Sequence, residues 1–157
     1  MTAFRRPAAD EVARVTTTAV ELLEFVWGRA STAPASASQL RVLHILEHHD
    51  GINLRALAES LASTPPSTSR LCDRLVAAGF VERVTGVQDR REVRLHLSSR
   101  GRAFLADLRA RREKELSRVL ADMPAAQRVA LLEGLEAFCA SAATQLHDTH
   151  GSDSRTA

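Results

Sequence analysis

Hydrophobic residues recur at helical spacing along most of the chain. Between Ala8 and about Ala30 they are separated by steps of three and four residues, which places them on one stripe of a helix. The same spacing predicts a second helix from about Ser38 to His49, after a break in the proline-containing segment 31–36. The stripe of the first helix consists of Val12, Val15, Ala19, Leu22 and Val26.

Two shorter helices are predicted next, with a tight turn between them. Asn53 is a suitable N-cap for the first, which is brief and apolar on one face. After the turn at 62–65, Pro65-Pro66 opens the second, because the first helical positions need no backbone N–H donor, and Gly79 ends it. This arrangement is typical of a helix-turn-helix motif.

A β-hairpin is predicted directly after this motif. Residues 80–85 favour one strand, and Val93, Leu95 and Leu97 alternate with polar residues in a second. The polar segment 86–90, which begins with glycine and ends with arginine, lies between them. Its position and charge are those of the wing in a winged helix.

Helical spacing returns after the hairpin. Ser98 can cap a helix that begins near Arg100, and a last helix follows the break at Met123-Pro124. The stretch Arg109–Glu115 is polar on all sides, so we expect it to cross solvent between two packed regions. After His147 the chain is small and polar, which predicts a frayed tail.

Composition and charge indicate a globular protein with one basic segment. The chain has 157 residues, of which 45% are hydrophobic and 25% charged, and its net charge is only +2. Residues 67–102 hold eight arginines and four acidic residues, a balance of +4, so the rest of the chain carries −2. Such a concentration favours a nucleic-acid docking surface on a neutral scaffold. No apolar run approaches the roughly 20 residues of a membrane helix, and no signal-peptide core is present, so we expect a cytoplasmic protein with no membrane partner.

Residues that usually carry catalysis, metal binding or redox chemistry are sparse. Cys72 and Cys139 are the only cysteines, and packing is the favoured interpretation of both. His44 and His48 have a spacing that suits one metal ion, but no further ligand accompanies them. The chain has no phosphate-binding glycine loop, Gly-x-Ser-x-Gly or His-Glu-x-x-His motif. We therefore expect no enzymatic activity, cofactor or metal, with zinc sensing and Cys72 oxidation as alternatives.

A series of short motifs occurs between about Gln39 and Leu108. They are, in order, Leu57-Ala58, Thr68-Ser69-Arg70, Asp73-Arg74-Leu75, Gly79-Phe80-Val81-Glu82-Arg83, Asp89-Arg90-Arg91 and Leu97-Ser98-x-x-Gly101. In order and spacing the series resembles the MarR family of transcriptional regulators, and its last two motifs are the most specific. Pro65-Pro66 falls where the family varies, and Ser98 stands where threonine is more usual.

The resemblance implies a mostly α-helical fold with a small β-hairpin wing: a winged helix-turn-helix flanked by long helices that interlock in a homodimer. Residues 8–37 would form the N-terminal dimerisation helix and linker, and 38–100 the DNA-binding lobe. Residues 101–147 would supply the C-terminal dimerisation helices, and 148–157 a flexible tail. The apolar stripes of the long helices have little local core to cover, which agrees with burial against a partner.

The resemblance and the helix geometry together predict the residues that contact double-stranded DNA. On the second helix of the motif, the recognition helix, the apolar side chains must face inward and leave the polar ones outside. Arg70 is placed to bind a guanine through two hydrogen bonds, and Arg74 to hold a phosphate. At the wing, arginine can enter the minor groove while Asp89 pairs with a neighbouring arginine. The predicted contacts are Ser67, Thr68, Ser69, Arg70, Arg74, Asp89, Arg90 and Arg91.

The resemblance also implies a small-molecule pocket between the dimer helices and the DNA-binding lobe. The elements that would line it carry Trp27, Arg41, His44 and Phe104, and we expect a small aromatic or phenolic effector. The chain is thus predicted to be a ligand-responsive repressor that binds a pseudo-palindromic operator as a homodimer. A winged helix used only for protein contacts and a non-specific DNA-binding protein are the alternatives, which the salt dependence and sequence preference of DNA binding separate.

Overall fold

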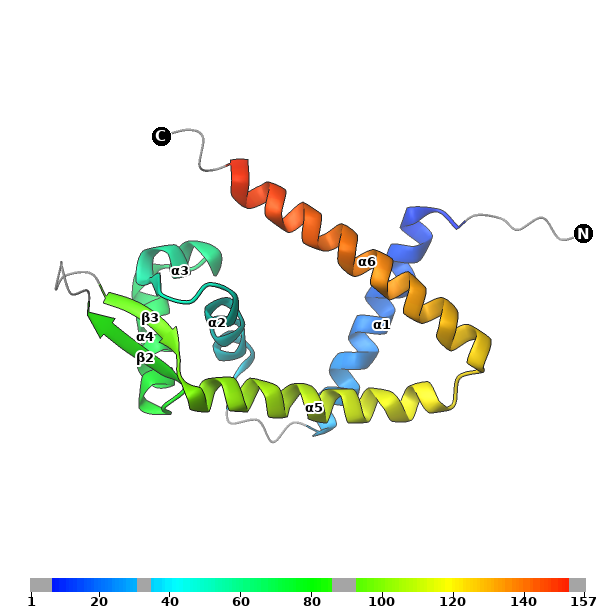
Figure 1. Ribbon diagram of the computed structural model, residues 1–157, viewed down its shortest axis with the longest axis horizontal. Coiled ribbons are helices and arrows are strands. Elements are labelled where there is room, and N and C mark those ends of the chain that lie inside the picture. Colours follow the sequence, from blue (N-terminus) through cyan, green and yellow to red (C-terminus); the bar gives the residue numbers. More distant parts are fainter. Residues whose placement is uncertain (1–6, 31–34, 86–92, 153–157) are drawn as a thin grey trace, which may run out of the picture. The chain divides into compact units, whose positions relative to one another are not determined.

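The computed structural model describes residues 7–30, 35–85 and 93–152 (Figure 1). The chain divides into two compact units, Met1–Glu115 and Leu116–Ala157. The described helices are α1 (Ala9–Ala30), α2 (Ala37–His48), α3 (Leu54–Ser60), α4 (Pro65–Ala77), α5 (Ser99–Ala121) and α6 (Ala125–Ser152). The described strands are β1 (Ile52–Asn53), β2 (Val81–Thr85) and β3 (Val93–Leu97). The predicted class, a mostly helical winged helix with a small sheet, is confirmed.

Local side-chain chemistry explains where the helices of the first unit begin. The Ser36 hydroxyl accepts a hydrogen bond from the Gln39 backbone N–H at 3.3 Å, and the Gln39 side chain accepts one from the Ser36 N–H at 2.8 Å. This reciprocal capping box starts α2. The predicted cap of α3 is confirmed, because the Asn53 side chain accepts from the Ala56 N–H at 2.8 Å. Pro65 and Pro66 occupy the first turn of α4, as predicted.

The sheet is antiparallel, with strand order β1-β3-β2. Val81 lies opposite Leu97 and Thr85 opposite Val93, so the predicted hairpin strands are confirmed. Its tip falls in residues 86–92, outside the described ranges. β1, which pairs Ile52 with Leu95, was not predicted, because two residues are too few to show an alternating pattern.

The core of the first unit lies among α2, α3, α4, the sheet and the first turns of α5. The rings of Phe80 and Phe104 stack there with centroids 4.8 Å apart. Phe104 lies one helical turn before the buried Leu108 and shares its inward face, and its role as a pocket residue stays a prediction. The core residues buried to 1% exposure or less are Val42, Leu43, Leu46, Leu57, Cys72, Leu75, Leu95 and Leu105.

Ser98 and Gly101 join the end of α4, the sheet and the start of α5. The Ser98 hydroxyl donates to the Gly79 carbonyl at 2.7 Å and accepts from the Gly101 N–H at 2.9 Å. The Ser98 N–H donates to the Phe80 carbonyl at 3.0 Å. Gly79 itself has a φ of +75°, the left-handed conformation with which glycine ends a helix. This geometry gives a physical reason for the Leu-Ser-x-x-Gly motif at 97–101.

The polar middle of α5 differs from its prediction. Instead of crossing solvent alone, Arg109 pairs with Glu47 of α2, and the Arg112 guanidinium lies 4.8 Å from the centre of the Trp27 ring of α1. The same residues that make this stretch look solvated are long enough to reach two neighbouring helices. A run of charged residues that looks solvated in the sequence can therefore make specific contacts with other helices in the fold.

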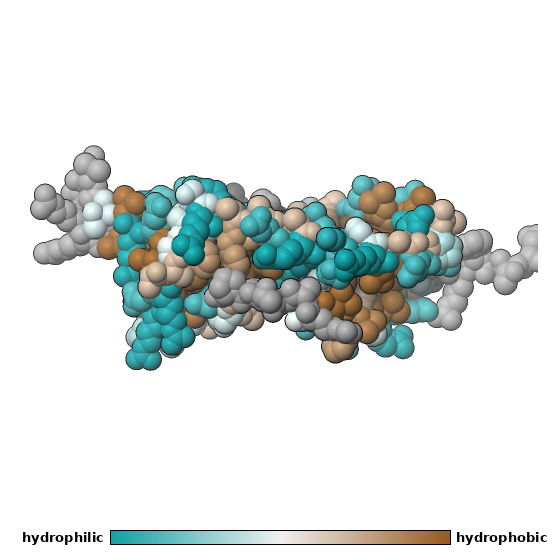
Figure 2. All heavy atoms as spheres, turned by 90° about the horizontal axis from the view of Figure 1, so that it is seen from below, coloured by the Kyte–Doolittle hydropathy of each residue, from teal (hydrophilic) through white to brown (hydrophobic). Residues whose placement is uncertain are grey.

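α1 and α6 expose apolar side chains. No described side chain on either helix is fully buried, and hydrophobic residues lie open at the surface (Figure 2). α6 also continues to Ser152, past the position where a tail was predicted, because no proline interrupts it. None of the described helices is long and apolar enough to cross a membrane. The large exposed residues are Val12, Val15, Val20, Leu22 and Phe25 on α1, and Val129, Leu131, Leu132, Leu135 and Phe138 on α6.

Replacing Gly101 with alanine tests the tight junction at the start of α5. The added Cβ would lie 2.7 Å from Leu97 Cδ1 and even closer to the Phe80 carbonyl oxygen, so the backbone has to shift. We expect Gly101→Ala to lower the free energy of unfolding by about 1–3 kcal/mol in urea denaturation followed by circular dichroism. Gly28→Ala is the control, because its Cβ meets nothing within 4 Å. An unchanged midpoint for Gly101→Ala would contradict the packing described.

Candidate nucleic-acid interface

α4 presents its apolar face to the core and a basic face outward. Arg70 and Arg74 are exposed and, within the described part of the chain, neither pairs with a carboxylate. Ser67 is exposed near the start of the helix, and Ser69 is half-buried. Four of the five residues predicted on this helix therefore have access to solvent on α4.

Thr68 is the exception, and its prediction as a DNA contact is wrong. Its side chain is fully buried, because it lies four residues before Cys72 and seven before Leu75 on the inward stripe of α4. Among the residues that the structure describes, its hydroxyl has no hydrogen-bond partner. Thr68 is a core position that happens to carry a polar group.

An ion pair joins the recognition helix to the wing. The Arg83 guanidinium of β2 donates to the Asp73 carboxylate of α4 at 2.7 Å. Both residues belong to recognised motifs, but sequence gives no sign that the two motifs meet in this way. The Asp73 carboxylate on the outer face of α4 thereby holds β2. Because Arg83 offsets its negative charge, Asp73 is not an unpaired charge on the surface that carries Arg70 and Arg74.

A second set of contacts holds β3 against the turn that follows α2. The His96 Nδ1 lies 3.1 Å from an Asp50 carboxylate oxygen, and Arg94 donates to the Gly51 carbonyl at 3.4 Å. Gly51 has a φ of +76°, which lets this turn approach the strand closely. The predicted wing-tip contacts Asp89, Arg90 and Arg91 lie outside the described residues and stay predictions.

An open groove of about 430 Å³ runs along α2. Of the four predicted pocket residues, Arg41 and His44 line it, whereas Trp27 and Phe104 do not. Trp27 is nevertheless next to it, since its ring lies under Arg112 and its Nε1 donates to the Arg112 carbonyl at 3.4 Å. The lining residues are Ala37, Leu40, Arg41, His44, Ile45, His48, His49 and Arg112.

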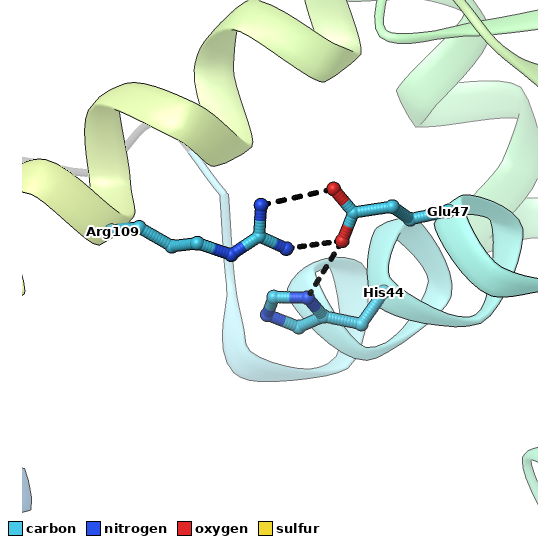
Figure 3. A network of polar contacts seen from close by, with 3 residues as sticks. All are labelled: His44, Glu47 and Arg109. Atoms are coloured by element: carbon cyan, nitrogen blue, oxygen red, sulfur yellow. Dashed lines mark hydrogen bonds and ion pairs between the residues drawn. The ribbon is translucent and has the colours of Figure 1, made fainter.

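Beside this groove, three residues form a polar network (Figure 3). Arg109 donates two hydrogen bonds to Glu47, one of them 3.0 Å long, and the His44 Nδ1 lies 3.9 Å from the same carboxylate. The hydrogen bonds from Arg109 lower the pKa of the Glu47 carboxyl, although burial opposes them. Burial lowers the pKa of His44, and the nearby Arg109 and Arg112 add to this effect while Glu47 opposes it.

Cysteine and metal chemistry find little support in the described residues. Cys72 is fully buried in α4, and burial raises the pKa of its thiol, which disfavours the reactive thiolate. Cys139 is exposed, and neither cysteine forms a disulfide. Across the described ranges, no group of three or more histidine, cysteine or acidic residues is placed to hold a metal ion.

Comparisons with known proteins agree with this architecture. A sequence model of the MarR family matches residues 35–93. The uncharacterised HTH-type transcriptional regulator YfiV of Bacillus subtilis is 30% identical over 100 residues, which are 64% of this chain and 62% of YfiV. The crystal structure of RV1404 from Mycobacterium tuberculosis superposes with a TM-score of 0.74 at 31% identity, over 87% of this chain and 96% of that one.

A solved structure with bound nucleic acid shares the fold. It is a mutant of MepR from S. aureus bound to an oligodeoxyribonucleotide, with a TM-score of 0.61 and 16% identity over 87% of this chain and 99% of that one. The chain thus aligns with less than two thirds of YfiV but nearly all of RV1404. It belongs to the MarR family, a class of winged helix-turn-helix regulators.

Substituting Thr68 tests whether its buried hydroxyl lacks a partner. We expect Thr68→Val, which keeps the shape and removes the hydroxyl, to raise the free energy of unfolding by about 1 kcal/mol. Thr68→Ser keeps the hydroxyl and loses the buried methyl group, so it should lower the same quantity. Urea titration of the three proteins measures both effects. A less stable Thr68→Val would show that the hydroxyl is hydrogen-bonded.

Proposed function

We propose that the protein is a transcriptional regulator that binds double-stranded DNA sequence-specifically through α4. The observation that carries the proposal is the two-sided character of this helix. Cys72 and Leu75 anchor one face in the core, while Arg70 and Arg74 extend from the other without carboxylate partners in the described residues. An anchored helix with unpaired arginines on its outer face is suited to the major groove.

Each predicted DNA contact on α4 that has access to solvent has a role in this proposal. Arg70, near the middle of the helix, contacts a guanine edge through two hydrogen bonds, and Ser67 and Ser69 contact bases or phosphates nearby. Arg74, one turn later, binds a phosphate. At the wing, Arg90 and Arg91 enter the minor groove. Asp73–Arg83 and Asp50–His96 support the proposal, because they hold the strands of the wing against the lobe.

The same proposal includes a homodimer. α1 and α6 expose large apolar residues such as Leu22, at 63%, and Phe138, at 59%, and bury none of their described side chains fully. Monomeric proteins rarely leave such apolar surface in water. A two-fold dimer places two copies of α4 about one turn of DNA apart, which accounts for recognition of a pseudo-palindromic operator.

Regulation completes the proposal, with the protein acting as a repressor whose operator affinity depends on an effector. The groove along α2 is the proposed effector site, because it has the size of a small-molecule site and contacts both α2 and α5. Its lining combines Leu40 and Ile45 with Arg41 and Arg112, which suits a small aromatic ligand that carries an acidic group. Such a ligand changes DNA affinity only if it binds the two conformations of the dimer unequally.

Fluorescence anisotropy on the upstream DNA of the gene, with scrambled DNA beside it across a salt series, tests sequence-specific binding. We expect the wild type to prefer the upstream DNA and Arg70→Ala to lose about 1–3 kcal/mol of binding free energy on that DNA alone. Arg111→Ala, an exposed arginine of α5, is the control for the same change in net charge. It should retain the preference.

The other outcomes of this experiment identify different functions. Equal, salt-sensitive binding to both DNAs would indicate a non-specific DNA-binding protein and contradict sequence recognition. Absence of binding to either DNA would favour a protein-interaction module. A loss in Arg111→Ala equal to that in Arg70→Ala would assign the effect to net charge instead of a contact by α4.

Analytical ultracentrifugation tests the dimer separately from DNA. We expect the wild type to sediment as a dimer, and Phe138→Glu to shift it to monomer, because an apolar interface cannot accommodate an unpaired carboxylate. Val84→Glu is the matched control, since Val84 is 48% exposed on a strand of the wing. A dimeric Phe138→Glu would exclude this part of α6 from the interface.

A further inference from the structure

The groove along α2 is basic, and within the described residues its two arginines lack carboxylate partners. Arg41 and Arg112 line it, and within the described residues neither forms an ion pair with an acidic side chain. The Arg112 Nε is buried and has no hydrogen-bond partner. No acidic residue is among the described lining residues. A groove with this composition is electrostatically suited to an anion.

The nearest carboxylate is already engaged. Glu47 lies one turn from His44 on α2, but both of its oxygens accept hydrogen bonds from Arg109 of α5 (Figure 3). Its carboxylate is thus held mainly by Arg109, with the His44 Nδ1 3.9 Å away as a weaker second partner. The groove is therefore left with the two arginines and the imidazoles of His44, His48 and His49 as its ionisable groups.

His44 stands between the groove and this network. Its Nδ1 lies 3.9 Å from the Glu47 carboxylate, and its ring lines the groove together with Arg112. The charged groups that act on it are Glu47 and His48 from its own helix, and Arg109 and Arg112 from α5. Burial is the largest cause that lowers the pKa of His44; Glu47 opposes it, and Arg109, Arg112 and His48 add to it, so the free protein favours the neutral ring more than an unperturbed histidine does.

We propose that this groove binds an organic anion together with a proton, and that His44 takes up the proton. A carboxylate placed near Arg41 and Arg112 offsets their positive charge and supplies an acceptor for the imidazolium. The step transfers one proton from a hydronium ion or buffer acid to the unprotonated ring nitrogen of His44: an N–H bond forms as the donor's bond to hydrogen breaks, and no covalent bond to the ligand is made. The inference rests on the proposed effector role of the groove, and it adds that the regulator responds to acidity and to its ligand jointly.

The sign of the pH dependence follows from linkage. Because the bound anion raises the pKa of His44, binding takes up a proton at any pH between the pKa of the free protein and that of the complex. In this window affinity falls by up to about tenfold for each unit of rising pH. Below the window His44 is already charged, and above it the ring stays neutral in the complex, so affinity is constant on both sides.

Trp27 allows a direct measurement. It is the only tryptophan in the chain, and its ring lies under Arg112 at the groove, so its fluorescence reports on an anion that reaches this arginine. We propose titrating the full-length protein, without DNA, with benzoate between pH 5 and pH 8. Calorimetry of the same titration in two buffers of different ionisation enthalpy counts the protons taken up.

The expected result is weaker benzoate binding as pH rises, with net uptake of a proton by the wild type, and a flat pH profile without uptake in His44→Gln. His96→Gln is the matched control, because this histidine lies on β3, pairs with Asp50 and does not line the groove. It should keep both the slope and the proton. Circular dichroism shows whether each variant is folded.

Three results would overturn the inference. The first is that benzoate does not bind at pH 5, and the second is that the wild type binds it without taking up a proton. The third is that the pH dependence of affinity persists in His44→Gln, or is lost in His48→Gln instead. Even if His44→Gln fails to fold, binding without proton uptake by the wild type overturns the inference, and His48→Gln shows whether the proton goes to that residue instead. Because no DNA is present, failure here leaves the anisotropy test of DNA recognition untouched, and failure of DNA recognition leaves this measurement valid.

Discussion

The Ser98 hydroxyl makes the contact on which the geometry of the lobe depends. It donates to the Gly79 carbonyl just after α4 and accepts from the Gly101 N–H in the first turn of α5. Since the Ser98 N–H also bonds to the Phe80 carbonyl, the end of the recognition helix, the last residues of β3 and the start of α5 share one point of attachment. Gly101 is required there because a side chain would meet the backbone of Phe80. The direction of α5 and the placement of α4 are therefore set together.

Charge has two different uses in this chain. Asp73, Asp50 and Glu47 each bind a basic residue from a different element, namely Arg83, His96 and Arg109. These pairs are partly exposed, so they add little stability, but they fix which surfaces of the elements face one another. The arginines left over within the described residues, such as Arg70 and Arg112, lie on the outer face of α4 and in the groove.

The sequence patterns predicted the helices and the hairpin strands well, but they predicted the contacts between distant side chains poorly. Helix bounds followed from apolar spacing and from caps such as Asn53 and Ser98, whose chemistry is local. Thr68 was predicted as a DNA contact because its polarity outweighed its register with Cys72 and Leu75 on the inward face of α4. The contacts of α5 with Trp27 and Glu47 join residues 85 and 62 positions apart, and no periodicity reports such pairs.

The weakness of the Arg109–Glu47 bridge matters for the proposed regulation. The first unit ends at Glu115 within α5, and before that point Arg109 contacts Glu47 of α2 and Arg112 contacts Trp27 of α1. In the proposed regulation, a ligand in the groove would act on α5 here, through Arg112 and through the carboxylate that His44 and Arg109 share. Had α5 been held there by a buried apolar contact, a small anion would supply too little differential binding energy to alter its position. A partly exposed ion pair, which solvent and salt screen, can exchange partners at lower cost than a buried apolar contact. If the proposed regulation holds, the polar middle of α5 is therefore the segment in which ligand binding would be coupled most easily to movement of the DNA-binding lobe.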